Sequence, residues 1–124
     1  MGFDQYHEPP DELSEETRTF ARMCANLTEE AQAIGWYEQR LDLERDESAR
    51  AVMLDSLGEE YKHFCMELEF LFRRKPRWRE IAAGVLFRDG DIVAHGEAAE
   101  AATGAAEAGS GSGPSLGIGS LRGR

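Results

Sequence analysis

The chain has 124 residues, of which 41% are hydrophobic and 31% are charged, and its formal net charge is -10. This length allows at most one domain, and the acidic balance argues against a nucleic-acid partner, which would need a basic surface. No apolar run reaches the roughly 18 residues of a transmembrane helix, and residues 1–4 lack the basic and apolar regions of a signal peptide. We therefore expect a cytoplasmic protein that binds neither nucleic acid nor membranes.

Residues 1–12 are predicted to form a polar N-terminal arm. The pair Pro9-Pro10 blocks a regular helix here, because proline lacks the backbone N–H that a helix interior needs. Asp11 or Ser14 can cap the helix that follows, and acidic residues in its first turn suit the helix dipole.

The first long helix is expected from about Leu13 to about Leu41. Its apolar residues recur at steps of three and four, the spacing that places side chains on one helix face. They are Phe20, Met23, Leu27, Ile34, Tyr37 and Leu41. Glu30 interrupts this stripe at mid-length. Because a buried carboxylate is costly without a partner, Glu30 either has one or reaches water at a half-buried edge.

Trp36 and Tyr37 add a large aromatic surface near the end of this helix. Such side chains usually lie in a core or an interface, which is the interpretation that we prefer. A supporting role for Tyr37 behind Glu30 is the alternative.

The second long helix is expected from about Ser48 to Arg74, after a short polar connection that makes the two helices antiparallel neighbours. Its main stripe consists of Met53, Leu57, Glu60, Phe64, Glu67 and Leu71. His63 follows Glu60 by three residues, so both side chains can point at one object. Carboxylate oxygen and imidazole nitrogen together suit iron, manganese or zinc.

Glu30 precedes the connection near residue 45 by about as many residues as Glu60 follows it. In an antiparallel hairpin the two carboxylates therefore reach the same level. Helix formation alone does not require this symmetry. It is the best geometric indication that Glu30, Glu60 and His63 share a metal site.

A second apolar stripe on the same helix predicts self-association, because one hairpin and a short helix cannot cover both stripes. This outer stripe consists of Leu54, Tyr61, Cys65, Leu68 and Phe72. Cys24 and Cys65 are interpreted as small buried hydrophobic residues rather than as a redox pair, because the cytosol is reducing.

The remaining chain is predicted to contain a short third helix, a linker and a terminal peptide. The helix spans about Trp78 to Phe87 and completes a domain over residues 13–95. Residues 96–113, rich in Ala, Glu, Gly and Ser, are expected to be a flexible linker. Residues 114–124 are interpreted as a docking peptide that orders on a partner, because Leu116, Ile118 and Leu121 are apolar anchors among glycines. The alternative is a disordered tail with chance apolar residues.

A ferritin-like di-iron bundle takes a Glu from each of two helices and a Glu-x-x-His from each of two others. This sequence supplies half of each, so two copies would complete a four-helix bundle with a shared site. The expected class is accordingly all-α: an antiparallel two-helix hairpin plus a short C-terminal helix, which pairs as a dimer.

Several motifs together resemble encapsulated ferritin. They are the early His7-Glu8-Pro9, Glu29-Glu30 with Trp36-Tyr37-Glu38-Gln39-Arg40, Glu59-Glu60 with His63, and Glu67-Leu68-Glu69 before a basic helix end. The segment 115–122 is similar to the peptide that docks cargo on the inner wall of an encapsulin shell.

The resemblance implies a ring of dimers, a decamer, that oxidises Fe(II) at a di-iron site between subunits and stores iron inside an encapsulin nanocompartment. It implies that Glu30, Glu60 and His63 are the ferroxidase ligands. It also implies that Glu29 helps to bind metal at an entry site, before the metal reaches those ligands. Gln32 stands where relatives tend to have an acidic residue, which implies weaker metal uptake.

Two other functions fit the same residues. One is a non-enzymatic cargo or assembly protein in which the metal bridges chains, and redox turnover under O₂ would distinguish it. The other is a di-iron scavenger of peroxide or oxygen, which would consume peroxide with little mineral formation.

Overall fold

The computed structural model describes residues 5–110. Within that range the chain forms a 3₁₀ turn, Pro10–Glu12, and four α-helices, and it contains no strand. The helices are α1 Glu15–Leu43, α2 Glu47–Arg74, α3 Pro76–Val85 and α4 Ile92–Ser110. The predicted all-α class and the boundaries of the first three helices are confirmed to within about two residues.

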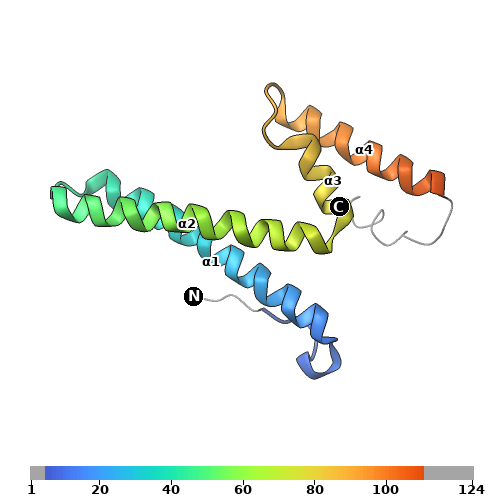
Figure 1. The fold of residues 1–124 in the computed structure, drawn as a ribbon, viewed down its shortest axis with the longest axis horizontal. Helices are drawn as coiled ribbons and strands as arrows, with labels where there is room; N and C mark the ends of the chain where they lie inside the picture. The colour runs from blue at the N-terminus through green and yellow to red at the C-terminus, as the bar shows by residue number, and fades with distance from the viewer. Residues whose placement is uncertain (1–4, 111–124) are drawn as a thin grey trace. The chain divides into compact units, whose positions relative to one another are not determined.

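Helices α1 and α2 form the antiparallel hairpin that the sequence predicts (Figure 1). Ser14 caps α1, since its Oγ accepts a hydrogen bond from Thr17 N at 3.1 Å. Asp46 caps α2 in the same way, with Ala49 N donating to its Oδ2 at 2.9 Å. Arg50 Nη1 closes the connection by donating to the carbonyl oxygens of Leu41 and Glu44. The hairpin register is thus held by local contacts at its closed end.

The described core is small. Its buried apolar residues are Ala25, Leu41, Leu57, Leu71 and Phe72, and Leu71 is fully buried. Outer-stripe residues Leu54 and Tyr61 remain about half exposed. Cys24 is partly buried, but Cys65 is exposed, so the predicted burial of Cys65 is wrong for the single chain. The sequence predicts self-association from this outer stripe, and the exposure of Leu54, Tyr61 and Cys65 is consistent with that prediction, although Phe72 is buried within the chain.

Helices α3 and α4 form a second antiparallel pair in a separate compact unit that begins at Lys75. The helices approach closely at Gly84, where an added Cβ would lie 2.6 Å from Ala99 Cβ. Thr103 is buried, accepts a hydrogen bond from Arg77 Nε at 3.3 Å and donates one to the Glu100 carbonyl.

Two sequence predictions differ from the structure in this region. Residues 96–110, predicted as part of the flexible linker, continue helix α4, and the predicted domain 13–95 is divided between two units. Alanine and glutamate have high helix propensity, and small side chains let α4 pack closely on α3. Residues 111–113 of the linker and the docking peptide 114–124 lie outside the described range. Among the described residues, no helix is long and apolar enough to cross a membrane.

Candidate metal centre

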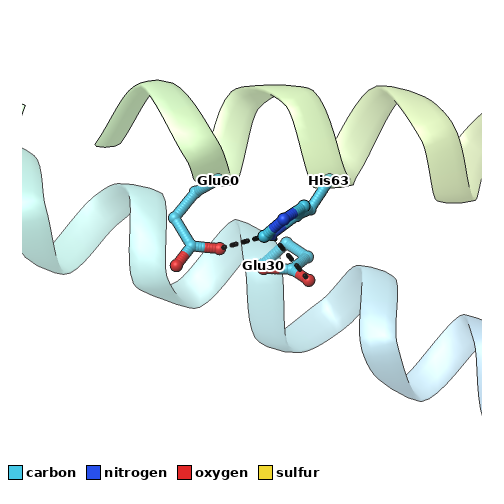
Figure 2. Close-up of side chains that lie close together, drawn as sticks. All are labelled: Glu30, Glu60 and His63. Atoms are coloured by element: carbon cyan, nitrogen blue, oxygen red, sulfur yellow. Dashed lines mark ion pairs between the residues drawn. The ribbon is translucent and has the colours of Figure 1, made fainter. Parts of the chain in front are cut away.

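Glu30 on α1 and both Glu60 and His63 on α2 turn toward one another between the two helices (Figure 2). His63 Nδ1 lies 3.9 Å from Glu30 Oε2 and 3.8 Å from Glu60 Oε1. One ligand atom from each residue falls within 4.8 Å of the others, a separation that one cation could bridge. The structure therefore brings together the three residues that the helical spacing placed at one level.

The centre borders solvent on one side. The side chains of Glu30 and Glu60 are 19% and 22% exposed, whereas that of His63 is 44% exposed. Leu57, one helical turn before Glu60 on the same face of α2, is buried. Three ligands with an open side leave room for further ligands from water or from a second chain.

The carboxylates perturb each other. The pKa of Glu60 is raised, first because its protonated form can hydrogen-bond to Glu30, and then because of partial burial and the Glu30 charge. The neighbouring His63 lowers the pKa of Glu60, but by less than these causes raise it. Two carboxylates held together repel when both are charged, and a cation removes this repulsion. The arrangement thus favours either a shared proton or a bound metal ion.

Two carboxylate oxygens on α2 are buried without a hydrogen-bond donor among the described residues: Glu60 Oε1 and Glu67 Oε1. A buried polar atom without a partner is unfavourable, so it indicates a group missing from the single chain. For Glu60 Oε1 the nearby ligand atoms suggest a cation. Glu67 does not belong to the cluster of ligand atoms.

Glu59 is a residue near the centre to which the sequence analysis gave no role. Its Oε1 lies 3.8 Å from His63 Nε2, on the opposite side of the ring from the two other carboxylates. Lys62 pairs with it at 2.9 Å, and this hydrogen bond is the main reason why the pKa of Glu59 is lowered. The sequence could have indicated this contact, because Glu59 precedes His63 by four residues and the two therefore lie on one helix face. Glu59 thus lies beside Nε2 of the ring, whereas Glu30 and Glu60 lie beside Nδ1.

The other predicted residues lie outside the cluster of three. Glu29 is exposed and contributes no ligand atom to it. Trp36 is about half exposed, and the ring of Tyr37 lies under the Arg40 guanidinium at 5.4 Å. The roles predicted for Glu29, Trp36 and Tyr37 remain predictions.

Comparison with known proteins identifies the family. A sequence model described as EncFtn-like matches residues 5–89, which is most of the chain and includes the whole centre. The chain belongs to the EncFtn-like family.

Relatives of this EncFtn-like chain agree with that assignment. A "Ferritin-like protein" of Thermotoga maritima is 41% identical over 90 residues, which cover 73% of this chain and 79% of the relative. An "Encapsulated ferritin-like protein" of Rhodospirillum rubrum is 38% identical over an alignment of 125 residues, covering 94% and 87%. A crystal structure of a Nitrosomonas europaea protein matches with a TM-score of 0.69 and 35% identity, covering 72% of this chain and 99% of that one.

Proposed function

We propose that this EncFtn-like protein is a ferroxidase that oxidises Fe(II) to Fe(III) at a di-iron site between two subunits, for iron storage inside an encapsulin nanocompartment. The observation that carries the proposal is the convergence of Glu30, Glu60 and His63 within 4.8 Å at one level of the hairpin. Family membership and the name of the Rhodospirillum rubrum relative support iron and encapsulation.

The proposal requires a second chain because one chain supplies only half of a ferritin-like ligand set. Two carboxylates and one imidazole from each of two chains would hold two ions side by side. The solvent-facing side of the centre and the half-exposed Trp36 and Tyr61 leave surface for that partner. A decameric ring of such dimers is part of the proposal.

The residues suit iron as a substrate. Carboxylate oxygens are hard ligands that stabilise Fe(III) relative to Fe(II), and imidazole suits both states. Each Fe(II) gives up one electron, so two neighbouring ions supply the two electrons that, with two protons from solvent, reduce one O₂ to hydrogen peroxide. Glu30 and Glu60 bring the two ions together by offsetting their mutual repulsion, and Glu59 orients the His63 ring.

The C-terminal residues 114–124 complete the proposal as the segment that docks on the encapsulin shell, with Leu116, Ile118 and Leu121 as its apolar anchors. An open ring encloses no storage cavity of its own, so the oxidised iron would collect in the surrounding shell.

The test begins with metal-free protein under anaerobic conditions. Fe(II) is added, the mass of the assembly is measured, and O₂ is then admitted while the Fe(III)-oxo absorbance is followed. We expect two irons per dimer and rapid oxidation. Glu30→Ala and His63→Ala should lose most of the rate, whereas Glu38→Ala, an exposed carboxylate on the same helix, should keep it. Metal-driven assembly without oxidation would instead indicate a structural metal protein, and unchanged rates in both variants would refute the site.

A further inference from the structure

A groove lies between α3 and α4, within the unit that begins at Lys75. It has a volume of about 310 Å³, at the lower end of the range for ligand pockets, roughly 300 to 1,000 Å³. We call it the α3–α4 groove. Four of its lining residues are alanine or glycine, and three are polar: Ala83, Gly84, Ala99 and Ala102, with Glu80, Arg88 and Thr103. A groove with such small side chains suits a short apolar segment.

The α3–α4 groove has a fixed shape. The two helices already touch beside it, because a Cβ added at Gly84 would lie 2.6 Å from Ala99 Cβ. The helices therefore cannot move closer to fill the space. Thr103 is buried, accepts a hydrogen bond from Arg77 Nε and donates one to the Glu100 carbonyl, so this wall is held in place. An apolar side chain that enters such a groove removes apolar surface from water, which is favourable.

The chain itself carries suitable side chains shortly after α4. This helix ends at Ser110, seven residues after Thr103, which corresponds to about 10 Å along its axis. Leu116 and Ile118 follow six and eight residues later, and an extended chain spans about 3.3 Å per residue. Glycines at two of the intervening positions allow the chain to reverse its direction. Both apolar residues can therefore return to the groove alongside α4.

The segment is complementary to the groove in shape and in charge. Leu116 and Ile118 alternate with glycines, so an extended conformation places both apolar side chains on one side and leaves the other side bare. Helix α4 carries Glu97 and Glu100 but no lysine or arginine, whereas residues 111–124 carry two arginines and no acidic residue. A segment that runs back along α4 thus brings its arginines toward these carboxylates.

We propose that residues 114–121 dock on the α3–α4 groove of their own chain, with Leu116 and Ile118 as the side chains that enter it. Because the segment is tethered to α4, its effective concentration at the groove is about millimolar, so a weak contact is enough to populate the docked state. The groove and the shell then compete for the same two side chains. The groove regulates shell docking, since it lowers the affinity for the shell by the fraction of time for which the segment is free.

The inference rests on the proposed function only in taking residues 114–124 as the segment that docks on the shell. The contact with the groove itself involves neither iron nor a second chain. It can therefore be tested on the metal-free, full-length protein.

Trypsin cleavage after Arg122, followed by mass spectrometry, measures how often the segment is released, because the protease acts on the open form. Ala102→Gln places a larger, polar side chain in the groove at an exposed helix position. The matched control is Ala101→Gln, an exposed neighbour that does not line the groove. We expect cleavage to be about tenfold faster in Ala102→Gln and unchanged in Ala101→Gln. Equal rates in all three proteins would overturn the inference.

Two further measurements identify the occupant. Methyl NMR of the unchanged protein should show a nuclear Overhauser effect between Ile118 and Ala102, and its absence would overturn the inference. The protection from trypsin should also be the same after tenfold dilution, because groove and segment belong to one chain. Protection that is lost on dilution would show that the segment comes from a second copy, which also overturns the inference.

Binding of a purified encapsulin shell protein separates this inference from the proposed function. We expect Ala102→Gln to bind the shell protein more tightly than Ala101→Gln does, by about the factor by which its cleavage is faster. Equal affinities would overturn the inference. Absence of binding by all three proteins would instead overturn the shell docking in the proposed function, whereas the contact with the groove would be judged by the cleavage rates.

Discussion

The neighbouring carboxylates Glu30 and Glu60 should make the stability of the metal-free chain depend on pH. The pKa of Glu60 is raised, chiefly by the hydrogen bond that its protonated form makes with Glu30. The folded chain therefore binds this proton more tightly than the unfolded chain does. The resulting stabilisation is complete below the usual pKa of a glutamate and is lost as pH rises through the raised pKa of the folded state.

The size of this pH-dependent stabilisation follows from the distance between the two carboxylates. Their ligand oxygens lie within 4.8 Å of each other, so the two charges repel when both residues are ionised. Two unit charges at that separation repel by about 1 kcal/mol in water and by about 3.5 kcal/mol at an effective dielectric constant of about 20. Because the centre is open to solvent on the side of His63, which is 44% exposed, we take a value near the lower limit. Glu60→Gln should thus raise the free energy of unfolding by about 1 kcal/mol at pH 7 and leave it nearly unchanged at pH 4.

The assay is urea unfolding followed by circular dichroism, in the presence of a chelator, at both pH values. Glu29→Gln is the control, because it removes an exposed carboxylate on α1 that contributes nothing to the cluster of ligand atoms. A difference between Glu60→Gln and the unchanged chain that is the same at pH 4 and pH 7 would refute the reasoning.

Adding metal should reverse the order of stability. A divalent ion at about 100 times its dissociation constant stabilises the folded state that binds it by about 2.7 kcal/mol. The unchanged chain should gain this stabilisation, whereas Glu60→Gln, which lacks one anionic ligand, should gain much less. Equal gains in both would show that Glu60 does not bind the ion.

Further predictions concern the scaffold. Gly84→Val should destabilise the α3–α4 pair by about 1 to 3 kcal/mol, because the added atoms would overlap Ala99. Gly96→Ala is the control and should not destabilise it, because the space around Gly96 is open. Thermal unfolding and limited proteolysis measure both effects. Ser14→Ala should cost about 1 kcal/mol by removing the α1 cap, as seen in urea unfolding. Arg50→Met should cost about 1 to 3 kcal/mol, since two carbonyl oxygens at the hairpin connection lose a charged donor, and amide hydrogen exchange at residues 41–46 should speed up.

The candidate centre could be predicted well because its determinants are local. Spacing by three residues puts Glu60 and His63 on one face of α2, and a short connection sets the level of Glu30 by counting. The level at which the three residues meet therefore does not depend on contacts between residues far apart in the chain. The position of Glu59 could have been found by the same rule, but its contact with the far side of the His63 ring depends on rotamers that spacing does not determine.

Other features could not be predicted because they depend on which surfaces meet. The composition of residues 96–110 suggested a linker, yet the close approach of Gly84 and Ala99 gives this stretch a helix to pack against. Cys65 shares the spacing of the outer stripe, but in the single chain it is exposed, as Leu54 and Tyr61 are, whereas Phe72 at the end of the stripe is buried. A helical pattern shows that a face is apolar and leaves open what covers it.

By itself, the sequence determined two long helices, their antiparallel pairing and the meeting of two carboxylates with one histidine, because helical periodicity and a short connection are properties of neighbouring residues. The tertiary structure decided the α3–α4 unit and the burial of the Glu60 and Glu67 oxygens. Those features arise from contacts between residues far apart in the chain, for which the sequence has no comparable period.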